Sequence, residues 1–542
     1  MRLFALFALL GSLPYVAPHA QLPSEAERTR IDAVFASFAT REGPGCALGI
    51  GRNGQLIYGA GYGMADLEHD IPITSSTPFY IASTSKQFAA FAIVLLARDG
   101  RLSFDDDVRR FVPELPDFGT PITVRHLLHH TSGLRDYFEV LGSRGWPFDG
   151  ALTVEEFLRL VARQRELNFP PGSHHLYSNT GYVLLSVIVQ RVSEKSLRQF
   201  AADRILGPLA MTRSLFRDDH RMLVPGRAIG YEMITGNTLR TSVPNFDVVG
   251  DGGLFSTTED LVKWDGNAYT PKAGDAADWK TMLSRGVLNS GDTIPYAMGL
   301  SHGVYQGRPT VAHGGAFGGY RADLLRFPEE RLGIAVLCNS AGANASGLAL
   351  RVANVLLPAR SPAPPLVPVS ANDRAIPDGR YLGARSDRWV LVSREGDSLV
   401  ASGPFARTAV AFTREGMEIN SQRITLRPRQ GAPAGEWEMS LGGTGYEPLV
   451  PLDATMPSPG AIAATMGEYV SPESDGRLTL IVESGQLTLR RVGAPPARLL
   501  PIGRNRFAAG PVLVTMLGAA PFDSLRVSTG RAWRVKYVRA SR

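Results

Sequence analysis

The amino-acid sequence predicts an α+β protein, in which an antiparallel sheet flanked by helices is followed by two small, barrel-like antiparallel β domains. Three observations support this fold class. Strand-like and helix-like segments are mixed over residues 21–357, a proline-rich stretch occupies residues 358–370, and the later sequence consists of short alternating segments with glycine turns. We therefore expect domains at residues 21–357, 371–455 and 456–542, with residues 358–370 as an extended, fairly stiff linker.

The first strong local pattern is a β-hairpin within residues 44–63. There Asn53-Gly54 separates two apolar runs, and this dipeptide is typical of a tight hairpin turn. Residues 84–98 then predict a helix with an apolar face, which Asp99-Gly100 closes.

Further elements follow towards the end of the first domain. The segment Ser256–Glu259 has the pattern of a capping box and predicts a helix that extends through Trp264. Residues 320–327 and 332–338 predict two strands joined by a turn, and residues 345–357 predict another helix.

The sequence beyond the proline-rich stretch contains a repeat. Gly379-Arg-Tyr381 and Gly467-Glu-Tyr469 are each followed by two strand-like runs with a glycine turn between them. Such spacing predicts two small antiparallel barrels or half-barrels. Trp389 and Trp533 are expected in the cores of these domains, in preference to a sugar-binding platform.

Composition excludes several classes of protein. The chain has 542 residues, 44% hydrophobic and 20% charged, with a formal net charge of +6. Its Lys and Arg residues form no run, so we expect no nucleic-acid partner. The two cysteines do not make a disulfide framework, and no Cys/His group has zinc spacing. We expect no metal or cofactor, because the group of His126, His129 and His130 does not come with the rest of a ligand set.

The N-terminal segment has the pattern of a secretory signal peptide over residues 1–20. Arg2 precedes the apolar run Leu3–Leu13, which is too short to span a bilayer, and Pro14 follows it. We expect cleavage after Ala20 and a periplasmic or secreted protein; the alternative is an uncleaved membrane anchor. No later stretch is apolar enough to span, so stable membrane insertion after cleavage is not expected.

The strongest chemical signal is Lys86, three residues after Ser83. Only six of the 57 Lys and Arg residues are lysines, and a lysine can lose its proton when desolvated whereas an arginine effectively cannot. Residues i and i+3 share one helix face, so a neutral Lys86 could take the proton of Ser83 and make it a nucleophile. The helix N-terminus would favour the developing negative charge. The alternative is an ordinary surface lysine.

Two further motifs contain residue types that such chemistry needs. Tyr177, if a neighbouring ammonium lowers its pKa, could act as a general base or acid, and Asn179 could hydrogen-bond both the lysine and a substrate amide. A core tyrosine with a helix-capping asparagine is the alternative. The segment His313–Ala316 contains two glycines that would let a substrate approach the backbone closely, and a backbone N–H there could complete an oxyanion hole with that of Ser83. Its alternative is a glycine-rich turn.

In this order, the three motifs resemble the serine β-lactamase and penicillin-recognising superfamily, within its class C β-lactamase, D-aminopeptidase and esterase branch. The resemblance covers residues 25–357 and also rests on His126–Leu134 and Gly252–Thr257. It implies a β-lactamase/transpeptidase-like fold for this domain. The order of one such domain and two β domains most resembles bacterial D-aminopeptidases.

The resemblance implies a role for each matching residue. Ser83 would be the acylated nucleophile, and Lys86 and Tyr177 would handle the proton during acylation and deacylation. Asn179 would position the substrate amide. The remaining substrate-binding residues would be those of the β strand, namely His313, Gly314, Gly315 and Ala316, the last donating its N–H with that of Ser83 to the oxyanion.

The resemblance also bears on the substrate. Relatives that bind a carboxylate have Lys-Thr-Gly where this chain has His313-Gly314-Gly315, which disfavours β-lactamase and carboxypeptidase activity. This departure fits a substrate with a free amine or a neutral ester, and the resemblance to D-aminopeptidases implies amide or peptide substrates that contain a D-amino acid. Such a substrate needs an anion for its ammonium, and Asp475 and Asp523 are the candidates. Carboxylesterase or weak β-lactamase activity is the alternative within this class.

Other readings remain open at this point. The chain could be an acylated sensor or envelope-binding protein with little turnover, or an adhesin built on the β repeats. In the resembling fold Cys46 and Cys338 lie on neighbouring antiparallel strands, so they form either a disulfide or two buried small hydrophobes. No feature of the sequence sets the oligomeric state or the preference for D or L substrates.

Overall fold

The computed structural model describes residues 22–540, apart from residues 237, 359, 361–366, 369–375, 397, 403–406, 413–416, 420–423, 430, 434, 442–445, 454 and 456. The expected signal peptide of residues 1–20 and most of the expected linker lie outside the described residues.

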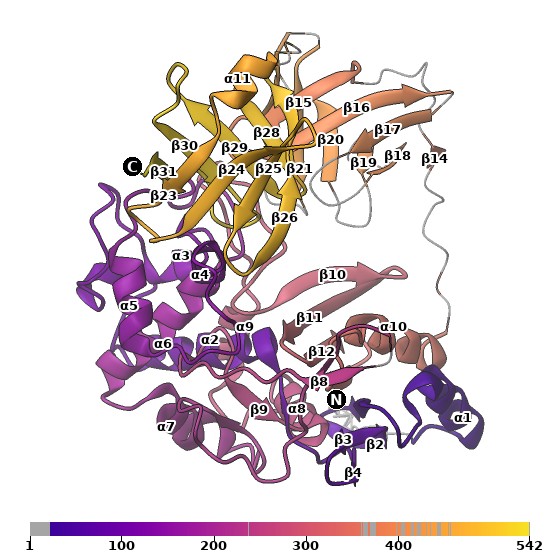
Figure 1. Ribbon diagram of the computed structural model, residues 1–542. Coiled ribbons are helices and arrows are strands. Elements are labelled where there is room, and N and C mark those ends of the chain that lie inside the picture. The colour runs from indigo at the N-terminus through magenta and orange to yellow at the C-terminus, as the bar shows by residue number, and fades with distance from the viewer. Residues whose placement is uncertain are drawn as a thin grey trace, which may run out of the picture.

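The first domain is built on a six-stranded antiparallel sheet in the order β10-β11-β12-β13-β1-β2 (Figure 1). The chain starts this sheet with one hairpin and returns to complete it after all the central helices. The strands are β1 (Cys46–Arg52), β2 (Gln55–Tyr62), β10 (Ser301–Tyr305), β11 (Arg308–Phe317), β12 (Tyr320–Phe327) and β13 (Leu332–Cys338).

Each face of the sheet has its own hydrophobic core. On one face, alternate residues such as Leu48 and Val336 pack with helices α1 (Glu25–Val34) and α10 (Ala345–Leu356). The other face packs against the central helices and α8 (Thr258–Gly266). The sheet is thus covered on both sides, as the α+β prediction requires.

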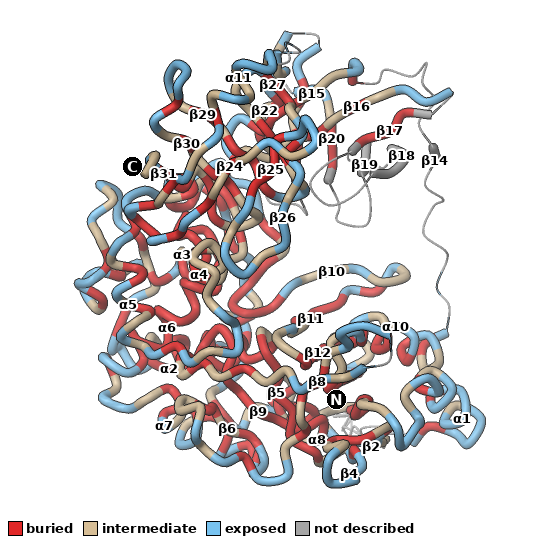
Figure 2. The backbone as a smooth tube through the Cα atoms, in the orientation of Figure 1, coloured by how far each residue is buried: buried red, intermediate tan, exposed pale blue. Residues whose placement is uncertain are grey.

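Helix α2 (Lys86–Arg98) forms the centre of the domain and is buried along most of its length, as Figure 2 shows. It follows the short 3₁₀ turn Ala82–Ser85 and packs against α6 (Asn179–Ser193) and α9 (Ala276–Met282). Its sequence is almost wholly apolar after Gln87, so its position in the core holds its first turn rigidly.

Smaller elements surround this centre. The helices are α3 (Val124–Leu128), α4 (Tyr137–Ser143), α5 (Val154–Ala162) and α7 (Leu197–Ala201), with a π-helical turn at Ala202–Leu206 and 3₁₀ turns at Ala36–Phe38 and Val108–Arg110. The short strands are β3 (Met64–Asp66), β4 (Ile71–Pro72), β5 (Phe79–Tyr80), β6 (Leu215–Phe216), β7 (Tyr231–Met233), β8 (Leu239–Thr241) and β9 (Leu254–Ser256).

The predicted local elements are present, with one correction. Asn53 and Gly54 both have positive φ, at 53° and 75°, in the turn between β1 and β2. The predicted capping box is displaced by one residue: Thr257 caps α8 by accepting from the backbone N–H of Asp260. Ser256 is instead buried at the end of β9, where its hydroxyl contacts that of Ser214.

A disulfide joins Cys46 to Cys338. The two residues are paired directly across the β1–β13 ladder. Of the two states left open by the sequence, the structure has the disulfide.

Two nine-stranded antiparallel sheets follow, as expected for barrel-like β domains. The first has the order β14-β18-β17-β16-β15-β22-β21-β20-β19, and an additional β18–β19 pairing closes all of these strands except β14 into a ring. Its strands are β14 (Val367–Pro368), β15 (Gly379–Gly383), β16 (Trp389–Glu395), β17 (Ser398–Ser402), β18 (Arg407–Phe412), β19 (Met417–Ile419), β20 (Ile424–Pro428), β21 (Trp437–Leu441) and β22 (Tyr446–Pro451).

The second sheet has the order β26-β25-β24-β23-β31-β30-β29-β28-β27 and follows helix α11 (Pro459–Ala463). Its strands are β23 (Gly467–Val470), β24 (Arg477–Glu483), β25 (Gln486–Arg491), β26 (Ala494–Arg498), β27 (Leu500–Gly503), β28 (Arg506–Ala509), β29 (Val512–Leu517), β30 (Ser524–Ser528) and β31 (Val535–Arg539).

The sequence repeat corresponds to the same part of both sheets. Gly379–Tyr381 lies in β15 and Gly467–Tyr469 in β23, each of which pairs with the next strand along the chain. The hydroxyls of Tyr381 and Tyr469 both donate to the carbonyl four residues earlier, at 2.7 and 2.9 Å. The same local contact in both copies shows that the repeat is structural.

The second sheet packs on the first domain. In Figure 1 it lies against helices α3–α5, while the first sheet lies beyond it. The buried guanidinium of Arg135 pairs with Glu473, and Trp533 packs with Phe169 and Leu176. Trp389 joins the cluster between the two sheets, so neither tryptophan lies simply within one barrel core.

Over the part of the chain that the structure describes, every helix is too short or too polar to cross a membrane.

Candidate active site

Ser83 lies in the 3₁₀ turn that leads into α2, at the edge of two cavities. The residue before it, Ala82, has a left-handed φ of 46°, which is uncommon for a residue with a side chain. Such local strain is found at functional sites, where the surrounding structure holds it in place. Here buried Ile81 and α2 hold the turn on either side.

Lys86 is fully buried one turn further along, and three oxygens surround its amine. Nζ lies 3.3 Å from Ser83 Oγ, 2.8 Å from Asn179 Oδ1 and 2.7 Å from the carbonyl oxygen of Asp251. A neutral amine has two hydrogens and one lone pair. If the carbonyl and amide oxygens accept the two hydrogens, the lone pair faces the Ser83 hydroxyl.

The surroundings of Lys86 favour its neutral form. Burial lowers the pKa of Lys86 well below its ordinary value, although the nearby carboxylates Asp251 and Asp136 act in the opposite direction. Burial also raises the pKa of Asp251, whose Oδ2 accepts a hydrogen bond from the Tyr137 hydroxyl at 2.9 Å. The alternative of an ordinary surface lysine is therefore wrong.

Tyr177 lines both cavities together with Ser83, and the Lys86 amine is 4.8 Å from its ring centroid. The expectation that a neighbouring ammonium lowers the pKa of Tyr177 is wrong, because burial raises this pKa well above 10 even though Ser83 acts against the shift. The resting side chain is a neutral phenol. Its buried hydroxyl makes no hydrogen bond to any described residue, so it is free to bond to a substrate or a water molecule.

Asn179 begins α6 and links Lys86 to a buried carboxylate. Its backbone N–H and its side-chain Nδ2 both donate to Asp136 Oδ2, at 2.7 and 3.0 Å. This fixes the amide so that Oδ1 points at Lys86. One of the two Nδ2 hydrogens goes to Asp136, and Asn179 also lines the larger cavity, where a substrate amide can reach its side chain.

The strand β11 brings His313–Ala316 beside the nucleophile. A Cβ on Gly315 would lie 2.2 Å from the carbonyl oxygen of Ile81 and 3.1 Å from Ser83 N, so only glycine permits this approach. The pairing of β10 with β11 ends at Ser301–Ala312. Within the described residues, 313–317 therefore have no strand partner on that edge, and the edge can face a substrate.

His313 is buried and neutral. Its Nδ1 lies 2.7 Å from the carbonyl of Gly314, so Nδ1 has to donate, and Nε2 then accepts from the Tyr296 hydroxyl at 2.9 Å. Burial lowers the pKa of His313 to about 3. His313 thus supplies neither a charge nor a free donor to a substrate carboxylate.

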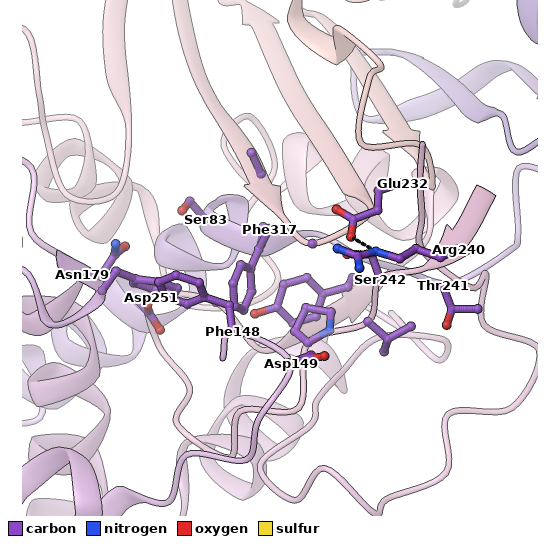
Figure 3. Close-up of a pocket in the computed structure, with 18 of the residues that line it drawn as sticks. Ser83, Phe148, Asp149, Asn179, Glu232, Arg240, Thr241, Ser242, Asp251 and Phe317 are labelled. Atoms are coloured by element: carbon purple, nitrogen blue, oxygen red, sulfur yellow. Dashed lines mark hydrogen bonds and ion pairs between the residues drawn. The ribbon is translucent and has the colours of Figure 1, made fainter. Parts of the chain in front are cut away.

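Two cavities meet at Ser83 and Tyr177. The larger, about 660 Å³, is also lined by Asn179 and by an aromatic wall of Tyr80, Phe138, Phe148 and Phe317. The smaller, about 430 Å³, runs along His313–Ala316 towards the N-terminus of α10. In the close-up of Figure 3, Ser83 and Asn179 lie towards one side of the larger cavity and the Glu232–Arg240 ion pair towards the other.

One residue of the larger cavity comes from the second β sheet. Arg531 lies in the turn between β30 and β31, and its Nη1 is 3.1 Å from Asp136 Oδ2. Asp475 and Asp523, the acidic candidates from this domain, line neither cavity. Asp475 instead pairs with Arg163. The expectation that this domain supplies an anion to the site is therefore wrong, because the residue it supplies is the cation Arg531.

The histidines of the first domain have structural contacts. His126 Nδ1 accepts from the backbone N–H of Thr123 at the start of α3, and His130 Nδ1 accepts from the N–H of Ser178 at 3.1 Å. His130 therefore supports the loop that presents Tyr177. Burial lowers the pKa of His129 to about 4.

Several site residues are absent from the sequence prediction. Asp251 precedes the Gly252-Gly253 motif but has no catalytic pattern of its own, and Asp136 resembles an ordinary helix N-cap. Phe148, Asp149 and Arg531 come from loops far apart in the sequence. Asp136 and Asp251 lie next to motifs, which does not give the direction of a side chain, and Phe148, Asp149 and Arg531 have no such sequence signal.

Comparison with known proteins agrees with this geometry. The family model described as Beta-lactamase matches residues 31–357. The chain belongs to the beta-lactamase family. The match includes the Ser83, Lys86, Tyr177 and His313 segments, so the site described above lies within this family's domain.

The curated relatives include D-aminopeptidases. That of Gluconobacter oxydans is 31% identical over 319 residues, which cover 58% of this chain and 60% of that protein. That of Cereibacter sphaeroides is 28% identical over 407 residues, which cover 71% of this chain and 76% of that protein. The chain thus aligns with only three fifths of the Gluconobacter protein.

Solved structures of similar fold include a penicillin-binding protein homologue from Pyrococcus abyssi, with TM-score 0.53 and 22% identity over 95% of this chain and 99% of that one. The D-amino acid amidase from Ochrobactrum anthropi SV3 has TM-score 0.52 and 24% identity over 61% of this chain and 98% of that one. At these identities, the likeness is one of fold.

Proposed function

We propose that this protein is a serine hydrolase that forms an acyl-enzyme on Ser83 and cleaves amide or peptide bonds of substrates containing a D-amino acid. The observation that carries the proposal is the contact of Lys86 Nζ with Ser83 Oγ at 3.3 Å, in surroundings that favour the neutral amine. The D-aminopeptidase relatives support the substrate class.

In the proposed acylation step, Lys86 takes the proton of Ser83 as Oγ attacks the substrate carbonyl. The negative charge that develops on the carbonyl oxygen is stabilised by the N–H groups of Ser83 and Ala316. The proton then passes to the leaving amine as the C–N bond breaks. Tyr177, whose hydroxyl is free, lies where it can relay this proton.

In the proposed deacylation step, a water molecule replaces the leaving amine. Lys86, with Tyr177 as relay, accepts its proton as the hydroxide attacks the ester carbonyl, and Ser83 leaves with a proton. Because the resting Tyr177 is a neutral phenol, the proton has to pass through Tyr177 to Lys86 and cannot be taken up by a tyrosinate.

The two cavities support an assignment of the substrate's two halves. The acyl part would occupy the larger cavity, whose aromatic wall suits a bulky apolar side chain, and the leaving group would lie along His313, Gly314 and Gly315. Glu232 is paired with Arg240 and Asp251 is buried, which leaves the exposed Asp149 as the carboxylate suited to a substrate ammonium.

An ester hydrolase is the second candidate. The neutral His313 and the side-chain-free Gly314 give no anchor to a substrate carboxylate, and the aromatic wall would also accept a neutral acyl group. The signal-peptide pattern of residues 1–20 supports the further proposal that the enzyme is exported.

The test is release of p-nitroaniline from D-alanine and D-phenylalanine p-nitroanilides, with the L isomers and p-nitrophenyl acetate in parallel. We expect release from the D-anilides, its loss in Ser83→Ala, and a weaker effect of Asp149→Asn that is confined to substrates with a free amine. Hydrolysis of the ester alone would favour the esterase. A stable acyl-enzyme by intact mass, without turnover, would point to a sensor.

A further inference from the structure

The turn Thr529–Arg534 of the second β sheet is fixed in the active site by its backbone. The carbonyl of Arg531 accepts from Asp136 N at 3.2 Å and from Asn168 Nδ2 at 3.1 Å. The N–H of Trp533 donates to Asn168 Oδ1 at 2.7 Å. These contacts position the Arg531 side chain independently of its own charge.

The Arg531 guanidinium faces two carboxylates and the catalytic tyrosine. Nη1 is 3.1 Å from Asp136 Oδ2, Nε is 3.8 Å from Glu139 Oε1, and the guanidinium lies 5.9 Å from the centroid of the Tyr177 ring. The Asp136 side chain is fully buried, whereas 32% of the Arg531 side chain is exposed. A buried carboxylate without a counter-charge is strongly unfavourable, and Arg531 supplies that counter-charge.

Asp136 connects Arg531 to the nucleophile. The same Oδ2 that binds Arg531 accepts both hydrogen bonds of Asn179, and Asn179 Oδ1 accepts from Lys86. The charge of a residue from the C-terminal β domain is thus linked to the base through one ion pair and the hydrogen bonds that follow it.

We propose that Arg531 is a positioning residue: by balancing the charge of Asp136 behind Asn179, it keeps Lys86 an uncharged base, so that the C-terminal β domain completes the catalytic site. The proposal rests on the serine–lysine chemistry proposed above and not on the D-amino acid substrate.

The charged and titratable groups around Lys86 give the direction of the effect. Asp251 and Asp136 favour the ammonium, and Arg531 opposes them. The other neighbours are uncharged, because burial lowers the pKa of His130 and His313 and raises that of Tyr177 and Tyr182. Removing Arg531 would leave two carboxylates unopposed, and Lys86 would hold its proton to higher pH.

The test is the pH profile of kcat/KM for p-nitrophenyl acetate with the full-length chain. In Arg531→Gln we expect the acidic limb of this profile to move to higher pH by about one unit. At pH values below the shifted limb, kcat/KM should be about tenfold lower than in the unaltered protein, and at high pH it should recover. Arg531→Lys keeps the positive charge, so its acidic limb should lie at the same pH as that of the unaltered protein. Arg526→Gln, in the same domain but outside both cavities, is the matched control and should match the unaltered protein.

The double variant R531Q/D136N tests charge balance and guards against misfolding, because it removes both members of the pair together. We expect its acidic limb to return to that of the unaltered protein. An unchanged limb in Arg531→Gln, or a loss of the same factor at every pH, would overturn the proposal. Ester hydrolysis that survives Ser83→Ala would instead overturn the proposed function.

Discussion

The two cavities that meet at Ser83 are lined by different sets of residues. The larger one joins loops of the first domain to Arg531 of the C-terminal β domain, and side chains make its wall: aromatic rings, an ion pair and a free carboxylate. The smaller one lies between β11 and the start of α10, and half of its lining residues are glycines and alanines; the others are Ser83, Tyr177, His313, Arg321, Asn344 and Ser346. On the assignment proposed above, the acyl half would meet large aromatic side chains, whereas the leaving group would meet more of the backbone. Discrimination should be strong for the acyl half and weak for the leaving group.

The largest effect should come from Lys86, which is buried behind Ser83, where the two cavities meet. Lys86→Ala and Lys86→Arg are both expected to lower kcat by about 10³-fold, because arginine keeps the charge but cannot accept the Ser83 proton. The loss should be equal for substrates that differ in acyl part and for those that differ in leaving group. Substantial activity in Lys86→Arg, measured with p-nitrophenyl acetate, would remove Lys86 from the proton-transfer role.

The pH dependence of kcat/KM should also be the same for substrates that differ in their acyl part and for those that differ in their leaving group. Burial lowers the pKa of Lys86 to about 7, and the base is active only when deprotonated, so kcat/KM should fall about tenfold for each pH unit below this value. The acidic limb should be the same for an ester and an anilide, because kcat/KM reports the ionisation of Lys86 in the free enzyme. Thermal melts at each pH are the control for unfolding. A profile flat down to pH 5 would contradict a lysine base.

A substitution in the aromatic wall should change the selectivity of the larger cavity and leave that of the smaller cavity unchanged. Phe148 is 42% exposed, stacks on Phe138 at 5.6 Å between centroids and lines only the larger cavity. Phe148→Ala is expected to reduce the preference for D-phenylalanine over D-alanine p-nitroanilide by about tenfold, because a large apolar contact is lost.

The matched control for this change is Leu223→Ala, an exposed apolar residue outside both cavities. A series of D-alanine esters with different leaving groups should respond equally in Phe148→Ala and the unaltered protein. A change confined to the leaving-group series would reverse the assignment of the cavities.

The sequence predicts the parts of this site that depend on local spacing. Ser83 and Lys86 are one helical turn apart, Tyr177 precedes α6 and Asn179 begins it, and the glycines of His313–Ala316 permit the approach of β11 to Ser83. Hairpin and helix boundaries follow in the same way, because turn and capping residues act within a few positions of themselves.

What the sequence does not predict depends on packing between distant segments. The predicted lowering of the Tyr177 pKa is wrong, because burial raises this pKa and outweighs the effect of the neighbouring charge. The sequence motif does not reveal that burial. Asp475 and Arg531 belong to the same β domain, yet only the docking of that domain decides that one pairs with Arg163 and the other enters the cavity. A one-residue displacement of the α8 cap has a similar cause, since Ser256 is taken up by a buried contact with Ser214.

The place of Arg531 in the chain has a consequence for biosynthesis. A ribosome makes Ser83, Lys86, Tyr177 and His313 long before it makes β30 and β31, so the first domain can begin to fold with the Asp136 carboxylate uncompensated. On the charge balance proposed above, Lys86 in this partial chain would hold its proton to a pH about one unit higher, and Ser83 would be about tenfold less reactive below that pH. Full nucleophilic activity would then arise only when the last sheet docks, and a nascent or truncated chain would be acylated more slowly by the esters or amides it meets.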